Sequence, residues 1–64
     1  MGLVNEEHKR IVEEGGGVYV AGMFGPLVLF NSPLTRSTLA IPEKDLTPEA
    51  VRSRIVQSDK QFGL

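Results

Sequence analysis

The residues able to do acid–base chemistry in this chain are few, and they are not spaced as a catalytic site. His8 is the single histidine among 64 residues, which excludes every mechanism that needs two histidines within one chain. A catalytic base needs an orienting partner and a nucleophile within hydrogen-bond reach. No serine falls in a nucleophile motif such as G-x-S-x-G. We therefore predict that the chain is not an enzyme and that His8 is a half-buried structural residue on the inner side of a helix.

Five glycines between positions 15 and 25 raise the possibility of a phosphate-binding loop. Nucleotide-binding fingerprints run from a strand through a glycine loop into a helix, and neither G-x-x-x-x-G-K-[ST] nor G-x-G-x-x-G occurs here. We instead predict a joint at Gly15, Gly16 and Gly17, with Gly15 in the left-handed position after a helix, and a tight hairpin near Gly25. Whether the joint is a working hinge stays open. The chain has no cysteine, which excludes disulfides and thiolate zinc sites, and we predict neither cofactor nor metal.

The charge balance gives no sign of a nucleic-acid or membrane partner. The chain has seven Lys/Arg and eight Asp/Glu residues, for a net charge of -1. Capture of nucleic acid needs several basic groups that converge on phosphates. The uncharged segment 15–35 is interrupted by five glycines and two prolines, which disfavours a membrane-spanning helix. The acidic beginning of the chain differs from a signal peptide. Together with the absence of cysteine, it leads us to predict a cytoplasmic protein.

Two helices are predicted, over residues 4–14 and 48–61. Asn5 is a suitable cap for the first, which ends at the triple glycine. Thr47 caps the second, and Pro48 occupies the first helical position, where its missing N–H costs nothing. Leu46 and Val51 are spaced to form a hydrophobic staple across this cap.

Three short apolar runs between the helices predict strands at residues 18–23, 27–30 and 37–41. Residues 1–64 are therefore expected to form a single small α+β domain with the element order α-β-β-β-α. We predict a three-stranded antiparallel sheet with both helices packed on one face. A meander is favoured, and a sheet with the third strand in the middle is the alternative.

The strands are apolar on both faces, but two short helices can cover only one face. The other face would present an exposed apolar patch, which usually marks an interaction surface. We predict that Tyr19, Met23, Phe24 and Leu27 lie on this surface. The sequence thus favours a noncatalytic protein–protein interaction module of unknown biological role that forms a homodimer, or an accessory subunit that binds a larger protein.

Two alternatives come from other classes of protein. The first is a small oligomeric nucleic-acid-binding regulator, in which two copies gather Arg36, Arg52 and Arg54 into one patch. Residues 52 and 54 point about 200° apart on a helix, so one copy cannot align them. The second is an enzyme whose site forms between subunits, where His8 of one copy meets carboxylates of another.

Overall fold

The structure is a computed structural model that describes residues 4–63 and, for residues 22 and 23, the backbone alone. The elements in chain order are α1 (Glu6–Glu14), β1 (Val18–Phe24), β2 (Leu27–Asn31), β3 (Thr38–Pro42), the 3-10 helix η1 (Glu43–Asp45) and α2 (Pro48–Gln61). The sheet is antiparallel in the order β1-β2-β3. The predicted α+β class, element order and meander are confirmed, whereas η1 was not predicted.

Side-chain caps fix where both helices begin. The Asn5 Oδ1 atom accepts a hydrogen bond from the His8 N–H at 3.1 Å, and Thr47 Oγ1 accepts one from the Ala50 N–H, also at 3.1 Å. These bonds satisfy N–H groups that have no partner within the first helical turn. Because Asn5 is the cap, α1 begins two residues later than predicted, while α2 begins at Pro48 as predicted.

The triple glycine between α1 and β1 is a packed connection. Gly15 has a φ of -82°, and the left-handed residue is Gly16, with a φ of 90°, so the prediction that Gly15 adopts the left-handed conformation is wrong. Gly15 is buried, and a Cβ atom added to it would lie only 2.6 Å from Val51 Cβ. The small residue lets the end of α1 approach the first turn of α2.

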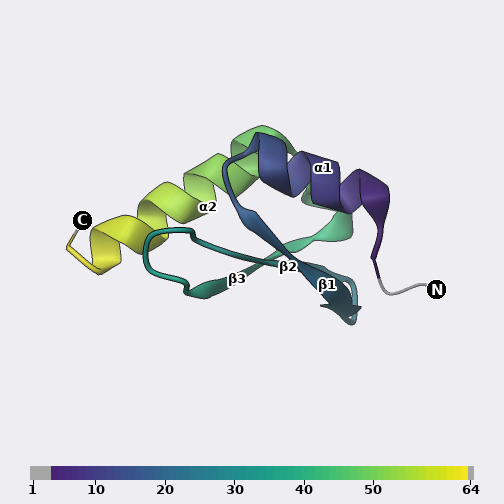
Figure 1. The fold of residues 1–64 in the computed structure, drawn as a ribbon, viewed down its shortest axis with the longest axis horizontal. Coiled ribbons are helices and arrows are strands. Elements are labelled where there is room, and N and C mark those ends of the chain that lie inside the picture. The colour runs from purple at the N-terminus through teal and green to yellow at the C-terminus, as the bar shows by residue number, and fades with distance from the viewer. Residues whose placement is uncertain (1–3, 64) are drawn as a thin grey trace.

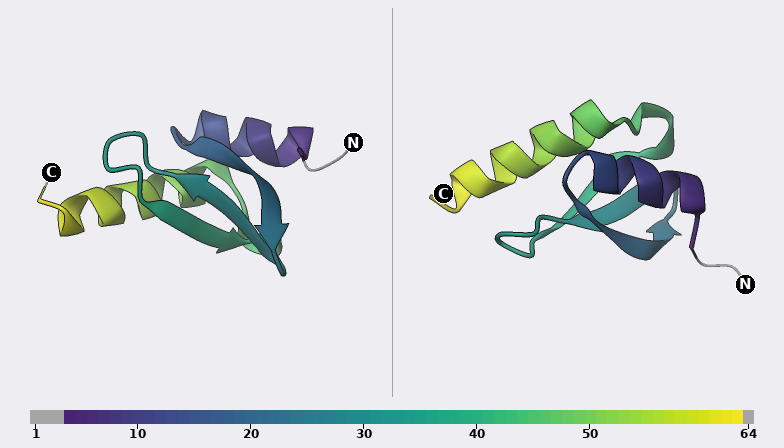
Figure 2. Two further views of the ribbon diagram at one scale, coloured as in Figure 1. Left: turned by 60° about the horizontal axis from the view of Figure 1, so that its bottom comes forward. Right: turned by 45° about the horizontal axis from the view of Figure 1, so that its top comes forward.

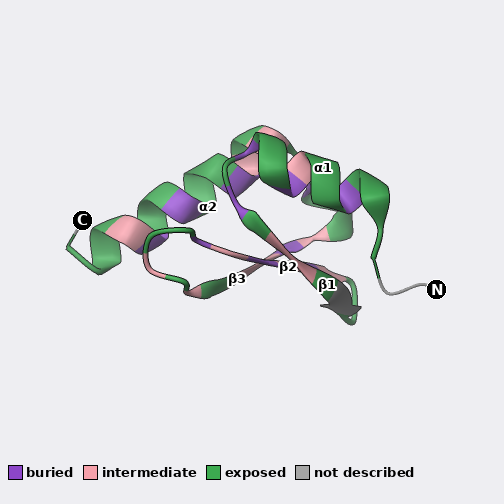
Figure 3. Cartoon of the chain, in the orientation of Figure 1, coloured by how far each residue is buried: buried purple, intermediate pink, exposed green. Residues whose placement is uncertain are grey.

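The hydrophobic core lies between the helices and one face of the sheet. Figure 1 shows both helices on the same side of the strands, and in Figure 3 the buried segments of α1 and α2 face the sheet. The buried apolar residues are Val12 from α1, Val28 and Phe30 from β2, Ile41 from β3, Leu46, and Val51 and Ile55 from α2. Leu46 and Val51 are the predicted staple residues. Every strand and both helices thus contribute to one core, β1 through the partly buried Tyr19.

The pairing of β1 with β2 contains a bulge. Tyr19 pairs with Phe30 and Met23 pairs with Val28, so residues 20–22 lie opposite Leu29 alone. The pairing of β2 with β3 is regular from Leu27 opposite Pro42 to Asn31 opposite Thr38. A bulge strengthens the local twist and interrupts the ladder. It makes the outer edge of β1 irregular.

Candidate functional site

The face of the sheet that points away from the helices carries exposed apolar residues, among them Val18 and Phe24. Directly paired residues share a face, and successive residues of a strand alternate between faces. Val28 and Phe30 point into the core, so their neighbours in β2 point outward. We call this surface the outer face. It consists of Val18, Phe24, Leu27, Leu29, Asn31, Thr38, Ala40 and Pro42.

Six of the eight residues of the outer face are apolar and none is charged, and the two polar residues are Thr38 and Asn31, whose Oδ1 atom is buried. In the left view of Figure 2 the strands pass in front of α2, and α1 lies above them. The Phe24 side chain is 73% exposed and that of Val18 is 51% exposed, while Leu27 and Leu29 are half-buried among their neighbours in the sheet. Scattered apolar residues are common on protein surfaces, but a contiguous patch indicates a binding surface.

The structure separates the four residues that the sequence analysis assigned to this surface. Phe24 and Leu27 are paired across the hairpin and both belong to the outer face. Tyr19 pairs with Phe30 and packs partly buried against the core, on the side of the helices. The backbone of Met23 pairs with Val28, but its side chain lies outside the described residues. Sequence analysis missed Val18 and Leu29, although strict alternation along β2 indicates Leu29 once Phe30 is assigned to the core.

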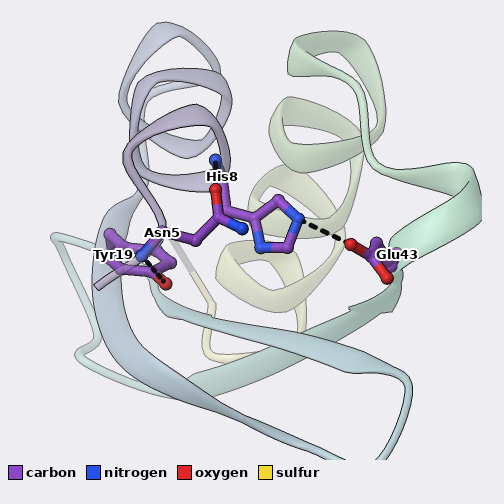
Figure 4. A network of polar contacts seen from close by, with 4 residues as sticks. All are labelled: Asn5, His8, Tyr19 and Glu43. Carbon is purple, nitrogen blue, oxygen red and sulfur yellow. Dashed lines mark hydrogen bonds and ion pairs between the residues drawn. The ribbon is translucent and has the colours of Figure 1, made fainter. Parts of the chain in front are cut away.

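His8 takes part in a polar network at the beginning of α1 (Figure 4). Its side chain is buried, and Nε2 lies 3.1 Å from Oε2 of Glu43 in η1. Nearby, the Asn5 N–H donates to the Tyr19 hydroxyl at 3.2 Å. These contacts link the beginning of α1 to η1 on one side and to β1 on the other. They thereby fix the position of α1 over the sheet.

The geometry of His8 suits a structural link better than a catalytic base. Because Nε2 faces a carboxylate, we assign it the ring proton, which leaves Nδ1 as an acceptor. Nδ1 is buried and has no hydrogen-bond partner among residues 4–63. A second buried polar contact lies at the other end of β2. The Ser32 hydroxyl donates to Asp59 at 2.9 Å and links the β2–β3 turn to α2.

Within residues 4–63, no group of three His, Cys, Asp or Glu side chains is placed to hold a metal ion. Over the same residues, neither helix is long and apolar enough to cross a membrane. The three arginines considered for nucleic acid lie on different features. Arg36 is in the β2–β3 turn, and Arg54 donates through Nη2 to the Ala40 carbonyl at 3.2 Å, whereas Arg52 is exposed elsewhere on α2.

A second surface lies between α2 and β3. Two hollows of about 270 and 220 Å³ flank Arg54, which lines both of them. Their walls are formed by residues of β3, by Asp45 of η1, and by α2 residues that follow one another at helical spacing from Ala50 to Gln61. We call the two hollows together the α2–β3 groove.

The outer face and the α2–β3 groove thus meet at strand β3, where Ala40 and Pro42 belong to both. No family model matches this chain, and neither a curated protein nor a solved structure matches it.

Proposed function

We propose that this chain is a noncatalytic protein–protein interaction module that self-associates through its outer face. The observation that carries this proposal is the contiguous, uncovered apolar surface around Phe24, Leu27 and Leu29. Covering these side chains removes apolar area from water, which is the main driving force for association. The partner that fits best is a second copy of the chain.

Charge supports self-association. The residues of the outer face include no Asp, Glu, Lys or Arg, so two copies can meet face to face without placing like charges opposite each other. A two-fold contact of this kind is isologous, because each copy contributes the same patch. A small chain also benefits from the contact, since 64 residues bury only about 60% of the surface exposed on unfolding. Oligomerisation is one of the usual supplements to so small a core.

The size of the sheet sets the expected affinity. Five residues in β2 and β3 make strands about 17 Å long, and three strands spaced about 4.8 Å apart are about 14 Å wide. The resulting area, about 240 Å², is well below the roughly 800 Å² that each partner contributes to a standard interface. We therefore expect a weak homodimer that forms and dissociates with concentration.

The test is the mass of the protein in solution, measured by sedimentation velocity over a concentration series from about 10 μM to about 1 mM, which brackets a weak complex. The parent chain should shift from monomer to dimer across this range. Phe24→Glu and Val18→Glu should remain monomeric, because each copy would bury a carboxylate in the contact. Circular dichroism verifies that both variants remain folded.

Val56→Glu is the matched control, because Val56 lies on α2 and is 49% exposed, close to the 51% of Val18. It makes the same chemical change at a similar exposure but away from the outer face, so it should dimerise as the parent does. A parent chain that is monomeric at the highest concentration would overturn the proposal. The proposal would also be overturned if Val18→Glu and Val56→Glu weakened the dimer equally.

A further inference from the structure

The free edge of β3 presents main-chain groups to the α2–β3 groove. The ladder between β2 and β3 is bounded by the bonds from the Glu43 N–H to the Pro26 carbonyl and from the Ser32 N–H to the Ser37 carbonyl. In an antiparallel pair, bonded and non-bonded positions alternate. The N–H and C=O groups of Thr38 and Ala40 therefore point away from β2. Arg54 binds the Ala40 carbonyl, and Pro42 ends this edge because it has no N–H.

The groove beside this edge has the length of a short extended peptide. The α2 residues that line it run from Ala50 to Gln61, which is about 16 Å along a helix. Five residues of extended chain span about 17 Å. A strand added to β3 would point alternate side chains toward α2, and the two hollows are placed to receive them. This is the geometry of strand addition, in which main-chain bonds give affinity and pockets give specificity.

The two hollows differ in chemistry. The larger is bounded by residues 40–42 of β3, by Asp45 of η1 and by Ala50, Ser53 and Arg54 of α2, so four of its seven lining residues are apolar. The smaller is lined by Leu39, by the polar side chains Gln57, Ser58 and Gln61, and again by Arg54. An apolar side chain suits the first hollow. A carboxylate suits the second, where Arg54 supplies a positive charge.

We propose that the α2–β3 groove binds an extended peptide that carries an acidic and an apolar side chain two residues apart. The peptide pairs with Thr38 and Ala40 as a fourth strand. Arg54 leaves the Ala40 carbonyl and binds the peptide carboxylate. The Ala40 carbonyl then becomes free to pair with the peptide main chain, so β3 accepts only a strand that offers Arg54 a carboxylate. A second copy of β3 does not fit here, because antiparallel pairing about Ala40 would place two Arg54 side chains side by side.

The test uses acetylated and amidated hexapeptides in a threonine and serine background. Each carries Glu, Gln or Lys at one position and leucine two residues before or after it. Binding is followed by ¹⁵N NMR titration of the Thr38 and Ala40 amide signals. The Glu peptide should shift both signals and bind about three- to fivefold more tightly than the Gln peptide, as expected for an exposed ion pair worth up to about 1 kcal/mol. The Lys peptide should bind most weakly.

Charge reversal separates a specific ion pair from general attraction. Arg54→Glu should invert the order, so that the Lys peptide binds more tightly than the Glu peptide. Arg52→Glu makes the same change on an exposed residue of α2 that does not line the groove, and it should preserve the order. In a further pair of peptides, either the odd-numbered or the even-numbered main-chain nitrogens are methylated. One of the two should bind at least tenfold more weakly, because methylation of the nitrogens that face β3 blocks main-chain pairing while every side chain stays unchanged.

The proposal fails if no peptide shifts the two amide signals at millimolar concentration, or if Arg54→Glu and Arg52→Glu have the same effect. It stands independently of self-association through the outer face. Phe24→Glu should abolish the dimer and still bind the Glu peptide. A Phe24→Glu protein that no longer dimerises but still binds the peptide would thus separate the two proposals. An Arg54→Glu protein that no longer binds the Glu peptide but still dimerises would separate them as well.

Discussion

Replacing Gly15 with alanine tests whether the triple glycine is a packed joint. The backbone of Gly15, with φ -82° and ψ -1°, is open to any residue, so alanine adds no conformational strain. It also lowers the entropy of the unfolded chain, which alone would stabilise the protein by about 0.4–1 kcal/mol. A flexible and loosely packed joint would therefore tolerate or favour Gly15→Ala.

The packing opposes this gain. The new Cβ would lie 2.6 Å from Val51 Cβ and 2.7 Å from the Pro48 carbonyl oxygen. Both positions are fixed by the first turn of α2, so α1 must move away. Such overpacking costs about 1–3 kcal/mol. After the entropic gain is subtracted, we expect a net destabilisation of about 1–2 kcal/mol, or a fall in Tm of about 4–16 °C for a domain of this size.

Urea unfolding followed by circular dichroism measures the effect, with the protein concentration held constant because self-association would add to the apparent stability. Val51→Ala should not rescue Gly15→Ala, because alanine keeps the Cβ atom that the new methyl group meets. The control is D-alanine at position 16 in a synthetic chain. Gly16 is exposed and has a φ of 90°, a conformation that a D-residue adopts without strain, so the D-residue should stabilise the fold. A Gly15→Ala protein as stable as the parent would refute the packed joint.

Three further substitutions test the polar contacts by the same urea assay. Thr47→Ala should cost about 1 kcal/mol, because it removes the oxygen that caps α2. Ser32→Ala should cost about 1–2 kcal/mol, because the Asp59 carboxylate loses the hydrogen bond that the buried Ser32 hydroxyl donates; a neutral result would mean that this bond adds nothing. Glu43→Gln should cost less than about 1 kcal/mol, since the Glu43 side chain is 58% exposed and glutamine can still accept from His8. A loss above 2 kcal/mol in Glu43→Gln would contradict the assignment of this contact as a minor structural link.

The parts of the fold that depend on neighbouring residues were predictable from the sequence. The caps at Asn5 and Thr47 and the staple of Leu46 with Val51 act within one turn of a helix, so the residue types identify them. The three strands followed from apolar runs bounded by glycine and proline. The meander followed because short connections favour adjacent antiparallel strands.

The features that depend on distant residues were not predictable in the same way. Tyr19 and Phe24 are both aromatic and both lie in β1, but the bulge at residues 20–22 and the pairing of Tyr19 with Phe30 decide their faces. Gly15 is required by its approach to Val51, which is 36 positions away in the chain and reached only through the fold. The α2–β3 groove likewise arises from how α2 lies along β3.

The edges of the sheet favour the outer face over edge pairing as the surface of the proposed self-association. An exposed edge strand invites open-ended pairing with further copies, and proteins block it with bulges, charged side chains and proline. In this chain the bulge interrupts β1, while Arg54 and Pro42 close β3. These features block pairing at both edges of the sheet but leave the apolar outer face exposed. In a two-fold dimer formed face to face, each copy covers the outer face of the other, so no outer face is left to bind a third copy. Under the proposal for the α2–β3 groove, Arg54 would oppose pairing with another β3 and admit a strand that brings a carboxylate, so one side chain would both limit aggregation and select a partner.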